Sequence, residues 1–253
     1  MPIFEIICLA NSRKNKGRCI AGLKTDGSGW LRPVSAQSDG RLDRDNYILD
    51  TNHEPQLFDI LEIECSERRP ECHQPENWLI TQKQWRFVGF PNRQKLTEVF
   101  KPELDKSAVL QGLLGNPSDR VDYELLQQNP TQDSLIYVKP QSINWVVQEY
   151  SGNKIYRSIF TTSNNIQYDL RITDPDWESR MAQAKLPVGN YSVDEVIDRL
   201  NLVGFTADGF RFTISLGEPF TPTGYDRRYC FKMIAAVINT TQITKRLNQL
   251  GGP

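Results

Sequence analysis

The chain has 253 residues, and its 30 Lys and Arg against 31 Asp and Glu give a net charge of −1. A hydrophobic content of 38%, with 11 Phe, 9 Tyr and 5 Trp, is enough for a packed core and excludes an intrinsically disordered protein. The near-zero net charge excludes a strongly basic protein that coats duplexes, so any nucleic-acid surface must be local. The length allows one large domain or two small ones.

The cysteines and the N-terminus indicate the compartment. The five Cys are an odd number and are widely spread along the chain. The first residues, MPIFEIICLA, lack the basic region and the long apolar run of a secretory signal. We therefore expect reduced thiols and a cytoplasmic protein. No apolar run approaches the length of a membrane span, so a membrane is not an expected partner.

Short strands dominate the first half of the chain. The clearest is Phe58 to Cys65, where Leu61, Ile63 and Cys65 share one face and acidic residues take the other. A proline early in residues 75–84 predicts a helix there. The strands expected in this half are 3–9, 18–23, 30–34, 58–65 and 97–100.

A polar segment interrupts the strands between residues 101 and 133, and its Asn-Pro steps at Asn116 and Asn129 indicate loops. We place a domain boundary near residue 130. The first unit then covers residues 1–130, with a helical linker at its end, and the second covers 131–253.

Strands resume in the second half, separated by compact turns at 151–153 and 163–165. Ser192 and Glu195 form a capping-box pattern at the start of an amphipathic helix over 192–202, inside an apparent insertion at 186–209. Many short strands and few helices predict a mainly β protein with two small barrels. The strands expected here are 134–139, 143–150, 155–162, 166–172, 210–216 and 230–239.

The segment from Leu9 to Ser35 is the strongest functional signal, because it holds six cations against one anion and places Trp30 after a Gly-rich turn. Cations can follow phosphates while an aromatic ring stacks a base, so the pattern predicts a site for single-stranded DNA or RNA. A solvated charged face is the alternative interpretation. Trp30 would stack a base, and the expected phosphate contacts are Arg13, Lys14, Lys16, Arg18 and Arg32, extended on the second unit by Arg227 and Arg228.

A second cluster of polar and aromatic residues, HQPENW, begins at His73. Its side chains either read bases or anchor the fold. The alternative function is therefore an enzyme or sensor that binds a nucleotide or modified base. Its pocket would contain His73, Glu76, Asn77, Asp174, Glu218 and Lys232.

Asp174 is either a helix cap or a carboxylate of that pocket, and Lys232, if it points inward, needs an acidic partner such as Glu218. The sequence lacks a P-loop, a dinucleotide fingerprint, a nucleophile elbow and a zinc-protease motif. Cys65, Cys72 and His73 have a spacing that matches no common zinc site. We predict no metal, no cofactor and no catalytic residue, and the interpretation leans away from an enzyme.

Four motifs in one order carry a family resemblance: CLANS with GRCIAG and GWLRPVS at 8–35, HQPENWLI at 73–80, TDPDWE at 173–178, and SLGEPF with FKMIAAVI at 215–238. The pattern resembles the bacterial dual OB-containing domain family over nearly the whole chain. The resemblance implies two tandem OB-like β-barrels, nucleic-acid binding, and an accessory role in a prokaryotic defence or DNA-processing system. A third hypothesis is a protein-interaction adaptor that uses the acidic 39–76 face or the inserted helix.

Overall fold

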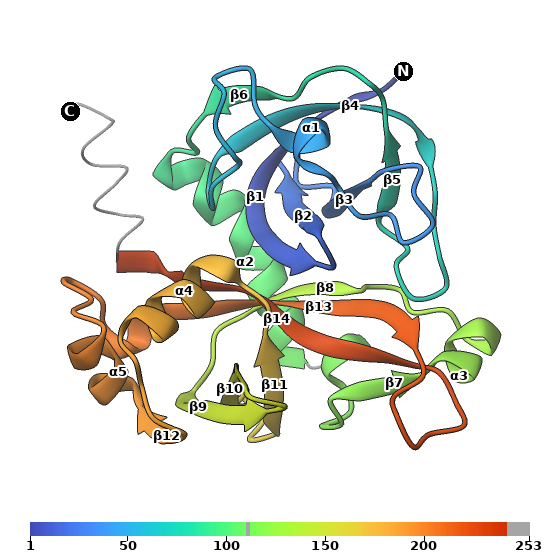
Figure 1. Cartoon of the computed structure of the whole chain (residues 1–253). Helices are drawn as coiled ribbons and strands as arrows, with labels where there is room; N and C mark the ends of the chain where they lie inside the picture. Colours follow the sequence, from blue (N-terminus) through green and yellow to red (C-terminus); the bar gives the residue numbers. More distant parts are fainter. Residues whose placement is uncertain (110–111, 242–253) are drawn as a thin grey trace.

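The computed structural model of this chain describes residues 1–109 and 112–241, and it contains two β units, one above the other in Figure 1. The first unit is built from six strands and one short helix. They are β1 (Ile3–Lys14), β2 (Gly17–Lys24), β3 (Trp30–Val34), α1 (Arg44–Tyr47), β4 (Ile60–Arg68), β5 (Asn77–Ile80) and β6 (Arg86–Gly89).

Five of these strands close into a barrel in the order β1-β2-β3-β5-β4, and β4 pairs back onto β1. The β3–β5 pair is parallel, whereas the other pairs are antiparallel. At Gly22 a Cβ atom would lie 2.2 Å from the carbonyl oxygen of Ile7, so only glycine permits this close approach of β2 to β1. The barrel confirms the first predicted OB-like unit.

The alternating pattern expected in β4 is present. Leu61, Ile63 and Cys65 are buried in the barrel core, where they pack with Leu31 and Trp85. The acidic side chains between them take the outer face, as the period of two requires. The burial of one face therefore sets the register of this strand.

Two predicted elements of this half are wrong. Residues 97–100 belong to the helix α2 (Arg93–Val109), because Leu96, Val99 and Phe100 recur at helical spacing and pack together on one apolar cluster. Residues 77–80 form β5 instead of a helix, because this segment fills the gap between β3 and β4 and pairs with both. Pairing across the barrel overrides the local helix signal there.

The second unit holds most of the remaining elements, and Figure 1 shows it below the barrel. They are η1 (Gly112–Leu114), β7 (Arg120–Asp122), α3 (Tyr123–Gln128), β8 (Leu135–Val138), β9 (Ser142–Tyr150), β10 (Asn153–Thr161), β11 (Gln167–Ile172), α4 (Pro175–Gln183), β12 (Gly189–Ser192), α5 (Val193–Arg199), η2 (Ala207–Gly209), β13 (Phe210–Phe220) and β14 (Tyr229–Asn239).

The pairing order of the second sheet repeats that of the first. Strands β9-β10-β11-β14-β13 follow one another as β1-β2-β3-β5-β4 do, and β11 pairs parallel with β14 as β3 does with β5. The described pairings leave β12 and β8 at the two ends of this sheet, and β7 adds to β14. Residues 113–128, which we expected in the first unit, therefore pack with the second, because β7 pairs with β14 and Leu113, Leu114 and Leu126 lie in its core. The fold is therefore mainly β, with one closed barrel and a second sheet of OB-like topology.

The amphipathic helix expected over 192–202 is present as α5, which spans Val193–Arg199. Ser192 caps α5 and Glu195 completes the capping box with the backbone N–H of Ser192. Val196 and Leu202 are buried in the core of the second unit, and Val193, Ile197, Leu200 and Phe205 pack against it, whereas Val188 and Val203 are exposed. The helix therefore presents no continuous apolar stripe to a partner. No helix in the described ranges is long and apolar enough to cross a membrane.

A shared apolar core joins the two units. It contains Leu9 and Trp30 from the barrel, Phe100 from α2, and Tyr137 and Ala235 from the second sheet. Across the same junction, the Thr213 hydroxyl donates to the backbone oxygen of Leu9 at 2.7 Å. The barrel face that carries β1, β2 and the start of β3 is therefore packed against the second unit.

Candidate functional site

Trp30 lies inside this shared core, where only 5% of it is exposed. Its indole Nε1 donates to a carboxylate oxygen of Glu103 on α2 at 2.8 Å. The expectation that Trp30 stacks a base is corrected, because neither the ring nor its donor faces solvent. The Gly-rich turn before it positions an anchor between the barrel and α2.

Arg32 is also internal, with 1% exposed. Its Nη2 donates to the hydroxyl oxygens of Ser134 at 2.8 Å and Ser215 at 3.3 Å. Ser134 in turn donates its backbone N–H and its hydroxyl to Glu76, both at 2.6 Å. These contacts bind β3 to the second unit, and Arg32 has no access to a phosphate.

The HQPENW motif occupies the same junction. His73 is 3% exposed, and its Nε2 donates to Glu218 of β13 at 2.9 Å, while the Lys14 ammonium contacts the other oxygen of Glu218 at 2.7 Å. Burial opposes ionisation of Glu218, but these two donors outweigh it and lower the pKa of its carboxyl to about 2. Gln74 donates to the backbone oxygen of Leu216 at 3.0 Å. We call these contacts, together with those of Arg32, Ser134 and Glu76, the interdomain polar seam.

The predicted pocket is therefore not one site. His73, Glu76 and Glu218 lie in the seam, and the Asn77 side chain donates to Gln74 beside them at 3.2 Å. Because His73 is sealed between the units, the seam offers no open cleft for catalysis. The motif was identified correctly as a cluster, but its polar groups bind one another across the junction.

Asp174 lies apart from the seam, as the N-cap of α4. It accepts the backbone N–H groups of Asp176, Trp177 and Val237, at 3.0, 3.2 and 2.8 Å. Burial raises the pKa of its carboxyl to about 6. Its three backbone donors show a structural role, which agrees with the capping interpretation.

Lys232 also lies apart, buried in the core of the second unit. Its ammonium donates to the backbone oxygen of Asn116 at 2.6 Å and lies 5.7 Å from the ring centre of Tyr168. Burial lowers the pKa of this ammonium to about 8. Of the two orientations that the sequence left open, Lys232 takes the inward one, but its contact is a carbonyl oxygen instead of Glu218 or Asp174.

Two pairs of arginines remain at the surface of the junction, and each pair interacts with one carboxylate. Arg13, Arg44 and Arg171 are exposed, and Arg18 is half-buried. Arg13 contacts Glu178 at 3.2 Å. Burial raises the pKa of the Glu178 carboxyl, and the positive charges of Arg13 and Arg171 oppose this rise. Arg18 contacts Glu54 at 3.2 Å and Arg44 contacts it at 3.9 Å. We call these four residues the arginine track: Arg13, Arg18, Arg44 and Arg171.

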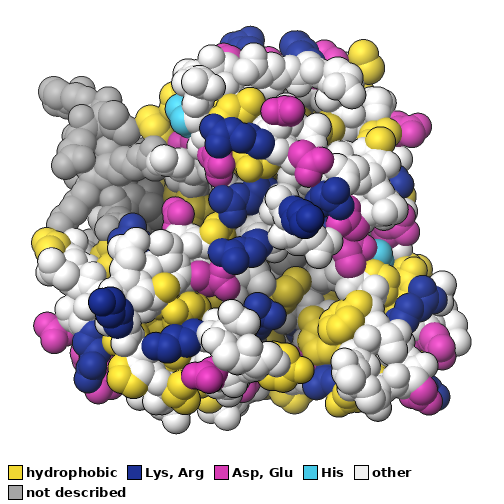
Figure 2. All heavy atoms as spheres, viewed as in Figure 1, with side chains coloured by type: hydrophobic (Ala, Val, Ile, Leu, Met, Phe, Trp, Pro, Cys, Tyr) yellow, Lys and Arg dark blue, Asp and Glu magenta, His cyan; other side chains and the backbone are white. Residues whose placement is uncertain are grey.

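The arginine track spans both units. Arg13 and Arg18 lie on the β1–β2 hairpin, Arg44 on α1, and Arg171 on β11. Lys16 is exposed at the tip of the same hairpin. Figure 2 shows Lys and Arg side chains gathered down the middle of the face that carries this hairpin, with acidic side chains between them. Arg13, Lys16 and Arg18 of the predicted set are thus at the surface, whereas Lys14 is used in the seam.

Sequence reasoning missed Arg44 and Arg171. Arg171 could have been found from the alternation of β11, where Gln167, Asp169 and Arg171 point outward and the residues between them are buried. Arg44 could not have been found in this way, because it lies within an acidic stretch of the sequence. The folded chain brings it to Glu54, which Arg18 also contacts.

A hollow of about 200 Å³ lies beside the track, between the barrel and the start of α4. Arg18, Glu54 and Asn11 line it from the barrel, and Asp174 and Asp176 line it from the second unit. Its carboxylates make it a poor phosphate site by itself.

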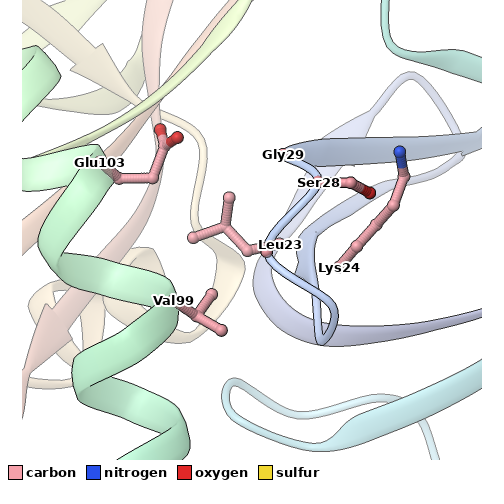
Figure 3. A pocket seen from close by; sticks show the side chains of 7 residues that line it. Leu23, Lys24, Ser28, Gly29, Val99 and Glu103 are labelled. Atoms are coloured by element: carbon pink, nitrogen blue, oxygen red, sulfur yellow. The ribbon is translucent and has the colours of Figure 1, made fainter.

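A second cavity, of about 360 Å³, lies between the β2–β3 turn and α2. Figure 3 shows Leu23 and Val99 between the turn and the helix, with Glu103 on the helix and Lys24 on the opposite side. Glu103 already binds Trp30. Leu23 and Val99 give this cavity an apolar part, and Lys24 is the one cation among its described lining residues.

Arg227 and Arg228 lie far along the second sheet, in the loop between β13 and β14. Arg227 contacts Asp122 at 3.3 Å, and the Arg228 guanidinium lies 4.5 Å from the ring centre of Tyr123. Both arginines are exposed. They belong to a different surface from the arginine track.

Among the described residues, no three His, Cys, Asp or Glu side chains are close enough to hold a metal ion. The fold and the junction define a protein with two OB-like units joined by a buried polar seam. The family model for the dual OB-containing domain matches residues 4–237, and the chain belongs to this family. No curated protein and no solved structure matches the chain significantly.

Proposed function

We propose that the protein binds single-stranded nucleic acid along the arginine track. The observation that supports this most strongly is the sharing of carboxylates. Arg13 and Arg171 interact with Glu178, and Arg18 and Arg44 contact Glu54, so four guanidinium groups meet two glutamates at this surface of a chain whose total charge is −1. OB-like barrels commonly bind oligonucleotides, which agrees with this proposal.

The arrangement favours a single strand over a duplex. The track combines guanidinium groups from two units, which suits a flexible backbone that follows the junction. Its charge excess is small and local, whereas a protein that covers duplex DNA presents a broad basic face. We further propose that this binding serves an accessory role in a prokaryotic defence or DNA-processing system.

The enzyme and adaptor hypotheses gain no support from a specific contact. His73 is buried against Glu218, and the apolar side of α5 packs into its own unit. Nucleic-acid binding is therefore the function that the surface supports best.

The test is fluorescence-anisotropy binding to single-stranded DNA, single-stranded RNA and duplex of equal length at low salt. We expect single strands to bind more tightly than duplex, and Arg13→Gln with Arg171→Gln to weaken binding. Arg86→Gln is a matched control, because Arg86 is also exposed but pairs one-to-one with Glu62 at 3.3 Å on the first unit. Absence of binding to every polymer would refute the proposal, and so would equal losses in the control.

A further inference from the structure

Two large aromatic side chains are exposed at the end of β13 and on the loop that follows it. Phe220 is 53% exposed and Tyr225 is 48% exposed. Figure 1 places this loop beside β7 and α3, and Figure 2 shows hydrophobic side chains gathered over that part of the molecule. Exposed rings of this size are costly to leave in water and indicate a binding surface.

The strand register determines which way the neighbouring rings point. Cys230 is fully buried, so Tyr229 and Phe231 on either side of it point to the opposite, outer face of the sheet. Phe220 is paired with Tyr229 across β13 and β14. The ring centres of Phe220 and Phe231 are 5.2 Å apart, and those of Tyr225 and Tyr229 are 5.6 Å apart.

A guanidinium group supports these rings from β7. Arg120 is paired with Phe231, and its guanidinium carbon lies 5.0 Å from the ring centre of Phe231 and 5.4 Å from that of Tyr225. Arg120 is itself held by Asp119 at 2.9 Å. The exposed rings are therefore positioned before any ligand arrives. We call this surface the aromatic platform: Phe220, Tyr225, Tyr229, Phe231 and Arg120.

We propose that the aromatic platform stacks the unpaired bases of the single strand whose phosphates bind the arginine track. This rests on the proposed function and adds to it a second contact of a different chemistry. Every base has a flat π-face, so stacking on Phe220 and Tyr225 would tolerate any sequence.

The local charge favours bases over phosphates as the occupants. The segments next to the platform, residues 119–124 and 226–228, hold three arginines (Arg120, Arg227 and Arg228) and four acids (Asp119, Asp122, Glu124 and Asp226). Arg120 and Arg227 are already paired with two of these acids. The surface therefore has no positive excess for a phosphate, while its rings remain open to a flat ligand.

The platform and the track are connected through one strand. The backbone N–H of Arg13 donates to the oxygen of Thr173, and the N–H of Thr173 donates to the oxygen of Ile234 on β14. Ile234 is separated from Tyr229 by about 17 Å of extended strand, at roughly 3.3 Å per residue. One OB fold engages roughly 4–16 nucleotides, so one oligonucleotide can reach both surfaces.

The experiment combines a protein change with a ligand change. Binding of a single-stranded oligonucleotide, and of the same oligonucleotide made abasic, is measured for the full chain and for Phe220→Ala with Tyr225→Ala. The control is Tyr150→Ala, because Tyr150 is an exposed aromatic at the end of β9, on a different hairpin. Phe220→Leu keeps an apolar side chain but removes the flat ring.

We expect the double variant to lose roughly 5- to 150-fold in affinity for the intact strand, at both low and moderate salt. It should bind the abasic strand as the unchanged protein does, and Phe220→Leu should show part of the loss. If the unchanged protein binds but the double variant binds equally well, or if Tyr150→Ala loses as much, the platform proposal is wrong. If the unchanged protein binds no single strand at all, the proposed function has failed first.

Discussion

Glu218 accepts hydrogen bonds from His73 and Lys14 across the junction, and its replacement tests the interdomain polar seam. Its pKa is lowered from 4.5 to about 2, despite the opposing effect of burial, by hydrogen bonding and charge from His73 and Lys14. At about 1.4 kcal/mol per pKa unit this corresponds to about 3 kcal/mol. Because 34% of the Glu218 side chain is exposed, solvent screening reduces the contribution to about 1–2 kcal/mol.

The sign follows from the direction of the shift. A carboxyl with a depressed folded-state pKa stabilises the fold above its unfolded-state pKa, and this stabilisation is lost as the pH falls toward the folded-state value. The window is therefore from about pH 4.5 down to about pH 2. Glu218→Gln should be less stable than the unchanged protein by about 1–2 kcal/mol at pH 7, and the difference should shrink across that window.

Urea unfolding at pH 7, 4.5 and 3, followed by tryptophan fluorescence, measures the difference. Glu149→Gln is the matched control, because Glu149 is an exposed carboxylate on β9. If the unfolding free energies of Glu218→Gln and the unchanged protein differ by the same amount at all three pH values, the reasoning is refuted. It would mean that the Lys14 and His73 contacts do not stabilise ionised Glu218.

Two buried side chains give further predictions. Trp30→Ala should cost about 3–5 kcal/mol of unfolding free energy. Trp30→Phe should lose only the hydrogen bond to Glu103, about 1–3 kcal/mol, and should bind single strands as tightly as the unchanged protein. A large loss of affinity in Trp30→Phe would show that the indole reaches the ligand. Burial lowers the pKa of Lys232 from 10.5 to about 8, so its ionised form destabilises the fold below pH 8 and this penalty is relieved as the pH rises toward 10.5. Denaturant unfolding at pH 7.5 and 10 should therefore show the unchanged protein gaining stability relative to Lys232→Met, and a constant difference would contradict this.

Local signals predicted much of the fold. The capping box at Ser192 and the alternation in β4 each depend on residues a few positions apart, and both are present. The segment at 97–100 was assigned wrongly because four residues cannot separate a strand from a turn of helix. The longer spacing of Leu96, Val99 and Phe100 was the better guide.

The repeated topology was not visible in the sequence. The strands of the two units pair in the same order, and each unit has one parallel pair, yet the strands β3 and β11 differ in length and composition. Topology depends on which strands meet. Many sequences satisfy the same pairing, as long as their apolar faces match.

The candidate site was only partly predictable. Charged residues that are neighbours in the β1–β2 hairpin point in different directions, so Arg13 reaches the surface while Lys14 enters the seam. The partner of Lys14, Glu218, is 204 positions away in the chain. Trp30 and Arg32 were assigned to a ligand because the sequence does not show that a second unit covers their face.

The salt dependence of single-strand binding tests the arginine track most directly. Each phosphate contact contributes about −0.7 to the slope of log K against log salt for a single strand. Arg13→Gln with Arg171→Gln should therefore make the slope shallower by about 1.4, whereas Arg86→Gln should leave it unchanged. An unchanged slope in the double variant, with binding intact, would contradict a role of the track in holding phosphates.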